Sequence, residues 1–303
     1  MKAPISVIIT VYNDYEYLTQ AINSVLTQTL LPSEIIIVDD GSKEYGAESI
    51  AKNFISNDKN IDILFFRKEN GGASSARNFG WNIASQELIA FLDVDDKMLP
   101  NNLKDKYEII KNLGENYFGV FCNTIRSTGK TDIFSDIDGV INTNLIDKEL
   151  IGIPGGIVTY LLRKKDLIEI GGFDEEIKCN EDYDILIRLL KNNKRCRSSN
   201  TISYYINIRE NSLSRNKNHI ITFKRVMNFL DKAEKFNYYD VDFLNQRKKE
   251  TYMLKVRFFL IKKEFINAFF TARKAFSYSK PITLNQKILY IVSLSFLNHK
   301  NEK

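Results

Sequence analysis

The feature that most restricts the fold is the alternation of short apolar runs with amphipathic stretches over the first 92 residues. Residues 5–11, 34–38, 61–66 and 88–92 are rich in β-branched and aromatic side chains, which favours strands. Between them, residues 15–27, 47–54 and 74–84 repeat apolar side chains at helical spacing. Strands that alternate with helices form a doubly wound, mostly parallel sheet. The sequence therefore predicts an α/β fold.

The remainder of the chain is less regular. A helix is expected over residues 102–113 and a strand near 118–123, and from residue 219 the pattern is helical only. We therefore expect an α/β domain over residues 1–218 and a basic helical C-terminal extension over residues 219–303. Charge is divided in a related way: residues 201–303 carry 20 Lys and Arg against 8 Asp and Glu, whereas residues 1–200 carry 23 against 30. An acidic half suits a metal-assisted site, and a basic half suits an anionic surface such as phospholipid headgroups.

Several protein classes lose support. Cys122, Cys179 and Cys196 are scattered and odd in number, so we interpret them as reduced thiols. The amino terminus lacks the pattern of a signal peptide, and no run of about 18 apolar residues occurs, so a cytoplasmic location without a transmembrane helix is expected. Neither a Walker loop nor a dinucleotide-binding glycine pattern is present, which removes the main support for kinases, P-loop hydrolases and dehydrogenases.

Acidic residues follow two of the predicted strands. Asp93, Asp95 and Asp96 come directly after residues 88–92, and crowded carboxylates of this kind suit Mg²⁺ or Mn²⁺ together with a diphosphate. A solvated acidic turn that caps the next helix is the alternative. Asp40, in the pair Asp39-Asp40 after residues 34–38, could accept a hydrogen bond from a nucleobase, although Asp-Gly is also common in ordinary turns.

Two further segments carry candidate residues. Residues 69–78 join a glycine turn to a helix start, and Arg77 in the first helical turn could reach a phosphate or a nearby carboxylate. Residues 180–184 open another helix with three carboxylates. Stabilisation by the helix dipole explains acidic residues there, but Asp182 is also the best-placed general base for an acceptor hydroxyl.

Taken in order, these motifs resemble glycosyltransferase family 2. The resemblance rests on residues 7–13, 38–42, 71–78, 93–96, 171–174 and 181–184 and covers about the first 215 residues. It implies a GT-A fold, with residues 1–100 as the nucleotide-sugar-binding half and 101–218 as the acceptor-binding half. It also implies an inverting displacement from a nucleoside-diphosphate sugar, with a UDP-sugar favoured, to a carbohydrate or lipid-linked saccharide acceptor.

The resemblance also implies roles for individual residues. Asp182 would be the catalytic base, Asp95 with Asp96 would bind Mn²⁺ or Mg²⁺ at the diphosphate, and Glu181, Gly172 and Phe173 would support the acceptor or the donor sugar. Six residues would bind the nucleotide sugar: Thr10, Tyr12, Asn13, Asp40, Arg77 and Asp93.

Arg209 is a departure from the family pattern, in which a His often stands at this point. An arginine does not ligate a metal but can bind a phosphate directly. In the basic extension, aromatic and apolar residues are interleaved with Lys and Arg. Packing on the enzyme and peripheral contact with the inner face of the cell membrane are both consistent with this pattern, whereas no nucleic-acid-binding module is present.

The function expected from the sequence is glycosyl transfer in bacterial surface polysaccharide or glycolipid assembly. A sugar nucleotidyltransferase is the enzymatic alternative, but it requires a Gly-rich loop with a basic residue after the first strand, which residues 10–14 lack. The non-enzymatic alternative is an inactive sugar-nucleotide-binding scaffold protein. The presence of Asp93, Asp95 and Asp182 together argues against a scaffold.

Overall fold

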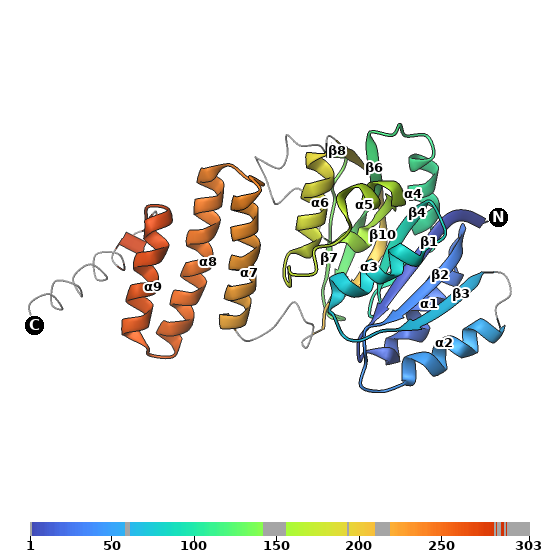
Figure 1. The fold of residues 1–303 in the computed structure, drawn as a ribbon, viewed down its shortest axis with the longest axis horizontal. Helices are drawn as coiled ribbons and strands as arrows, with labels where there is room; N and C mark the ends of the chain where they lie inside the picture. The colour runs from blue at the N-terminus through green and yellow to red at the C-terminus, as the bar shows by residue number, and fades with distance from the viewer. Residues whose placement is uncertain are drawn as a thin grey trace, which may run out of the picture. The chain divides into compact units, whose positions relative to one another are not determined.

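The computed structural model divides into two compact units, Met1–Glu210 and Asn211–Lys303 (Figure 1). It describes residues 2–57, 61–141, 156–192, 194–209 and 219–281, together with residues 283, 286, 287 and 289. The predicted boundary at residue 218 falls outside these residues.

The first unit is built on one mixed sheet with the strand order β3-β2-β1-β4-β9-β6-β10-β5. Strands β1 (Lys2–Val11), β2 (Leu31–Asp39), β3 (Asp62–Arg67) and β4 (Leu88–Asp93) pair in parallel, and β6 (Tyr117–Ser127) pairs in parallel with β10 (Arg195–Asn207). Strand β9 (Tyr160–Arg163) joins the two groups through antiparallel pairs with β4 and β6. Short strands β5 (Lys97–Met98), β7 (Asp132–Phe134) and β8 (Val140–Ile141) pair at its margins. The predicted, mostly parallel sheet is confirmed.

Helices cover the sheet as the alternation predicts. They are α1 (Leu18–Leu26), preceded by a 3-10 turn, η1 (Tyr15–Tyr17), then α2 (Gly46–Asn57), α3 (Ala73–Ile83) and α4 (Asn102–Ile110), followed by η3 (Ile157–Thr159), α5 (Lys164–Ile170) and α6 (Glu181–Lys191). Helix α3 packs against β1 and β2. A Cβ atom on Gly80 would lie 2.4 Å from Ile8 Cγ2, so a glycine is needed for this close helix–strand approach. The approach fixes α3 over the sheet and thereby places Arg77, in its first turns, at the sheet edge.

The second unit contains α7 (His219–Lys235), α8 (Val241–Ile261) and α9 (Phe265–Tyr278). Asp240 caps α8 by accepting a hydrogen bond of 2.7 Å from the Phe243 N–H. Ala268 and Ala272 of α9 are fully buried with Val256 of α8, and such small side chains let the two helices pack closely. The predicted helical C-terminal part is confirmed. Among the described helices, none combines the length and apolarity needed to cross a bilayer.

Candidate active site

The sheet register brings the predicted motifs to one edge. Thr10 of β1 lies opposite Asp93 of β4, and Val11 lies opposite Asp39 of β2. Because these strands are parallel, their carboxyl ends meet, as they do at the ligand sites of open α/β sheets. The Thr10 hydroxyl donates to Asp93 Oδ1 over 3.4 Å, which joins the first of the predicted nucleotide-sugar residues to the acidic motif.

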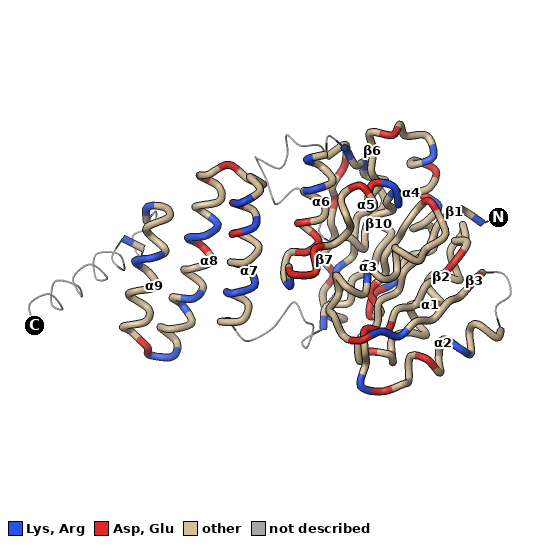
Figure 2. Tube along the Cα trace, viewed as in Figure 1, with Lys and Arg blue, Asp and Glu red and all other residues tan. Residues whose placement is uncertain are grey.

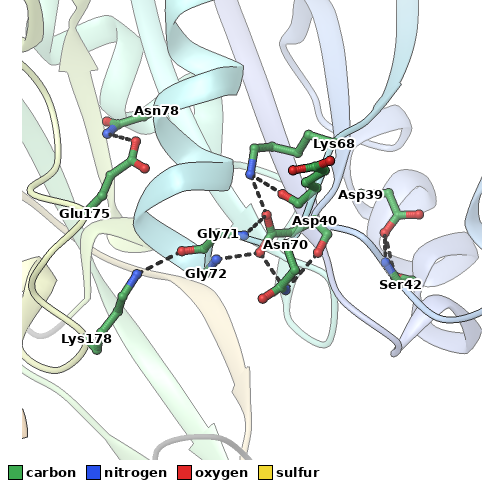
Figure 3. Close-up of polar contacts among 11 residues, drawn as sticks. Asp39, Asp40, Ser42, Lys68, Asn70, Gly71, Gly72, Asn78, Glu175 and Lys178 are labelled. Atoms are coloured by element: carbon green, nitrogen blue, oxygen red, sulfur yellow. Dashed lines mark hydrogen bonds and ion pairs between the residues drawn. The ribbon is translucent and has the colours of Figure 1, made fainter.

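Asp40 is buried at this edge and is held by the loop of residues 68–72 (Figure 3). Its carboxylate accepts hydrogen bonds from the backbone N–H groups of Gly71 at 3.0 Å and Gly72 at 2.7 Å. It also accepts from the Asn70 amide at 3.0 Å and from Lys68 Nζ at 2.8 Å. Both carboxylate oxygens are therefore already satisfied within the chain, and a nucleobase at Asp40 would share them with these donors.

Asn13 ties the ends of β1 and β2 together. It adopts a left-handed backbone conformation, with φ of 62°, which asparagine tolerates better than most residues. Its N–H donates to Ser42 Oγ at 2.8 Å, and its side-chain oxygen accepts from the Lys43 N–H at 2.9 Å. Tyr12 beside it is 39% exposed, so its ring is accessible to a ligand.

Arg77 links the acidic motif to the candidate base. Its buried guanidinium donates to Asp93 Oδ1 at 3.0 Å and to Asp182 Oδ1 at 3.3 Å, and it lies 3.7 Å from Glu181 Oε1. Asp93 and Asp182, which lie far apart in the sequence, thus share one cation. The structure brings together four of the predicted residues at this point, from β4, α3 and the start of α6.

Asp182 lies in an environment that disfavours its charge. Burial raises the pKa of Asp182 to about 6, and the negative charges of Glu181 and Asp93 add to the shift. Arg77 and the N–H of Ile157 oppose it by stabilising the carboxylate. The side chain remains 25% exposed, so an acceptor hydroxyl can reach it. A carboxylate with a pKa near 6 is a stronger base than an ordinary aspartate and is still ionised at neutral pH.

Phe173 lies near Arg77, and Gly172 precedes it in the chain. The Phe173 ring is buried, 5.7 Å from the guanidinium carbon of Arg77 and edge-on to Phe91 at 5.5 Å. Gly172 has φ of 69°, and a Cβ atom there would lie 2.6 Å from the Trp81 ring. The Phe173 ring therefore packs near Arg77, whereas Gly172 lies against Trp81 of α3.

The rest of the acidic motif meets Arg209. Asp95 Oδ2 accepts from Arg209 Nε at 2.8 Å, and Arg209 Nη2 lies 2.9 Å from Asp14 Oδ2. Asp96 is buried and accepts from the Asn207 N–H at 3.0 Å. Burial and the charge of Asp93 raise the pKa of both Asp95 and Asp96, and Arg209 opposes this shift at Asp95.

A family model described as glycosyl transferase family 2 matches residues 6–171. The chain belongs to this family. It is 32% identical over 194 residues to an uncharacterized glycosyltransferase of Rickettsia felis, a match that covers 62% of this chain and 31% of the relative. It is 29% identical over 214 residues to the minor teichoic acid biosynthesis protein GgaB of Bacillus subtilis, covering 69% of this chain and 23% of GgaB. The chain thus spans a third or less of the length of these two relatives.

Solved structures agree on the fold of this family 2 glycosyltransferase. The structure of S. aureus TarS residues 1–349 in complex with UDP-GlcNAc covers 92% of this chain with a TM-score of 0.62 and 20% sequence identity, and 81% of the TarS chain is matched. A structure of longer TarS covers 95% of this chain with a TM-score of 0.58, and 50% of that chain is matched. The predicted family and the GT-A fold are therefore confirmed.

Of the acidic motif, Asp95 is the carboxylate that could hold a divalent cation together with a diphosphate. Mg²⁺ in such sites takes one or two carboxylates and completes its shell with phosphate oxygens and water. Asp95 is 18% exposed and can serve as such a ligand, while Asp96 lies buried behind it. Within the described part of the chain, no group of three or more His, Cys, Asp or Glu side chains is arranged to hold a metal ion by itself.

Four further residues contact the predicted ones and were not among the predicted site residues. Lys68 follows β3, and the convergence of parallel strand ends could have identified it. Asp14 reaches Arg209 across 195 positions, and Ile157 reaches Asp182 through its backbone. Asn78, one residue after Arg77, holds the backbone of Phe173 by accepting from its N–H at 2.9 Å and donating to its carbonyl at 2.9 Å.

Proposed function

We propose that this glycosyltransferase moves a sugar from a nucleoside-diphosphate sugar, with a UDP-sugar favoured, to an acceptor hydroxyl with inversion of the anomeric carbon. The observation that carries the proposal is the Arg77 bridge, which joins Asp93 at the end of β4 to Asp182 at the start of α6. TarS, whose fold the chain shares, binds UDP-GlcNAc, which supports a uridine donor. Teichoic acid biosynthesis by GgaB supports bacterial surface polysaccharide or glycolipid assembly.

Inversion by one displacement requires a base on the acceptor side and stabilisation of charge on the donor side. Asp182 takes the proton from the acceptor hydroxyl as its oxygen attacks the anomeric carbon, and the bond to the diphosphate breaks on the opposite face. Arg77 fixes Asp182 relative to Asp93, so that base and donor keep one geometry. A divalent cation at Asp95, when bound, supplies positive charge for the departing diphosphate. Arg209 provides a second cation on that side.

Other predicted residues take places in the same scheme. Residues 1–100 form the nucleotide-sugar-binding half and residues 101–218 the acceptor-binding half. Thr10, Tyr12, Asn13 and Asp40 line the nucleotide end of the sheet edge, and Glu181 supports the sugar beside Asp182.

The proposal is tested by incubating the protein with UDP-sugars, Mn²⁺ and candidate lipid-linked saccharides, and by measuring UDP release and product anomericity. We expect transfer by the wild type and by Glu176→Gln, an exposed control on the segment before α6. We expect none by Asp182→Asn. Release of pyrophosphate from a nucleoside triphosphate and sugar phosphate would instead support a nucleotidyltransferase. Nucleotide binding without turnover on any acceptor would support the scaffold alternative.

We also propose that the helical unit contacts the inner face of the cell membrane, where a lipid-linked acceptor would lie. At the turn between α8 and α9, three apolar side chains, Ile261, Phe265 and Ile266, are 54–72% exposed beside Lys262 and Lys263. Lys and Arg also occur along α7, α8 and α9 (Figure 2). Exposed apolar side chains next to lysines suit an anionic lipid surface.

Vesicle co-sedimentation tests the membrane contact. Ile261→Asp should lose binding to vesicles of phosphatidylglycerol and phosphatidylcholine. Val241→Asp is the matched control, because Val241 is also 72% exposed but lies at the other end of α8, about 30 Å away at 1.5 Å per residue. Equal loss in both variants, or in neither, would refute the assignment of this turn.

A further inference from the structure

Arg209 pairs with Asp95, the carboxylate that the proposed function assigns to the metal. Its Nη2 lies 2.6 Å and its Nε 2.8 Å from Asp95 Oδ2. The same Nη2 lies 2.9 Å from Asp14, and the guanidinium carbon lies 4.9 Å from the centre of the Tyr17 ring. One cation is therefore already held at Asp95 by residues that follow β1, β4 and β10.

The neighbouring carboxylates do not offer a second place for a metal. Asp93 pairs with Arg77 at 3.0 Å, and Asp96 is 5% exposed and accepts from the Asn207 N–H. A divalent cation on Asp95 Oδ2 would lie within a few ångströms of the Arg209 guanidinium, and like charges at that separation repel strongly where water is scarce. A metal can therefore bind to Asp95 only as Arg209 moves off it.

We propose that Arg209 and the divalent cation are alternative partners of Asp95, and that the nucleoside diphosphate exchanges one for the other by drawing the guanidinium onto its phosphate oxygens. This inference rests on the proposed function, because it takes Asp95 as the metal ligand. A guanidinium can bind phosphate oxygens through two parallel N–H···O hydrogen bonds, as it can bind a carboxylate. The freed Asp95 then binds the cation that the diphosphate also ligates. Asp14, which is 38% exposed, is left to solvent.

The exchange predicts linkage that can be measured without any acceptor or turnover. Mn²⁺ is titrated by electron paramagnetic resonance into the free protein and into the protein with UDP, with corrections for Mn²⁺ bound to UDP alone. Wild type should bind Mn²⁺ weakly without UDP. Arg209→Gln should bind it more tightly, by about 5- to 150-fold, the usual range of coupling between two sites. The increase in Mn²⁺ affinity caused by UDP should be smaller in Arg209→Gln than in wild type.

Arg67→Gln is the matched control, because it removes one guanidinium of similar exposure that pairs with Asp39 at 3.2 Å instead of Asp95. It should bind Mn²⁺ in the free state as wild type does. An Arg209→Gln protein with wild-type Mn²⁺ affinity would overturn the exchange, as would equal tightening in Arg67→Gln. If Arg209→Gln fails to fold, Arg209→Met takes its place: it also removes the guanidinium from Asp95 and should tighten Mn²⁺ binding, and unchanged affinity overturns the inference.

Asp95→Asn separates this inference from the proposed function. If Asp95→Asn abolishes UDP-dependent Mn²⁺ binding while Arg209→Gln leaves the free-state affinity unchanged, the metal assignment stands and the exchange fails. If Asp95→Asn binds Mn²⁺ and UDP as wild type does, Asp95 is not the ligand and both fail.

Discussion

Two carboxylates at the same sheet edge are satisfied in opposite ways. Asp40 receives four donors, from Lys68, Asn70, Gly71 and Gly72. At Asp182 the number of side-chain donors per carboxylate is reversed. There, one guanidinium, that of Arg77, pairs with three carboxylates: Asp93, Glu181 and Asp182. A carboxylate with several donors is a fixed acceptor that organises a loop. Burial of Asp182 and the charges of two neighbouring anions raise its pKa, so it can take a proton.

Removal of the base tests this comparison most severely. Asp182→Asn keeps the shape of the side chain but cannot accept a proton, and loss of a general base typically costs about 10²- to 10⁴-fold in rate. We expect kcat to fall by that factor in a UDP-release assay, while the affinity for UDP measured by calorimetry stays near the wild-type value. Transfer at the wild-type rate would show that another group is the base.

The same variant should fold at least as well as the wild type. The pKa of Asp182 is raised to about 6 in the folded state, against 3.8 for an ordinary aspartate. The folded state therefore binds the proton more tightly than the unfolded state, and this stabilisation is full below about pH 4 and lost as pH rises through 6. Asp182→Asn has no carboxyl to ionise at this position, so the variant does not lose this stabilisation as pH rises. Its melting temperature at pH 7 should therefore not fall below that of the wild type.

Loss of the shared cation should instead destabilise the fold. Arg77→Met leaves Asp93 and Asp182 as neighbouring anions with no cation between them, and breaking a buried pair in this way costs about 3–5 kcal/mol. Urea unfolding at pH 7 measures the loss. Because protonation relieves the repulsion, the loss should shrink at pH 5. A loss that is the same at both values would show that Arg77 stabilises the protein through packing on Phe173 alone.

The first half of the fold was predictable because its strands are apolar on both faces and its helices are strongly periodic. β9 and β10 were not identified. β9 has only four residues, and β10 begins with charged and polar residues, although its second half, residues 201–206, is rich in β-branched and aromatic side chains and could have been recognised. Both gain their stability from pairing with β6, a contact that local sequence does not specify.

In the candidate site, the residues were predictable from sequence motifs, but the ion pairs between them were not. Asp93, Asp182 and Arg77 stand in recognisable motifs, but their sharing of one guanidinium depends on how α6 is placed against the sheet. The ion pair of Asp95 with Arg209 likewise spans 114 positions. The position of Lys68 directly after β3 was a usable signal, whereas the donation from Ile157 to Asp182 leaves no pattern in the sequence because it comes from a backbone N–H.

Asp40→Asn should have a smaller effect than loss of Arg77. The amide places an NH₂ group opposite the donors of the 68–72 loop and leaves at least one of them without an acceptor, a change that costs about 1–3 kcal/mol. Urea unfolding at pH 7 should show this loss. Asp138→Asn is an exposed control and should unfold as wild type does. If Asp40→Asn were as stable as the control, the loop would not depend on the charge of Asp40.

The smallest predicted effect is a shift of the pH–rate profile, which identifies the carboxylate that accepts the proton. Transfer needs ionised Asp182, so kcat/KM should fall about tenfold for each pH unit below an apparent pKa near 6. Asp95 and Asp96 also have raised pKa values, so the acid limb alone does not identify the group. Glu181 raises the pKa of Asp182 by its charge and is not among the causes at Asp95 or Asp96. Glu181→Gln should therefore move the limb to lower pH if Asp182 is the base, and a limb that stays in place would assign the titration to another carboxyl.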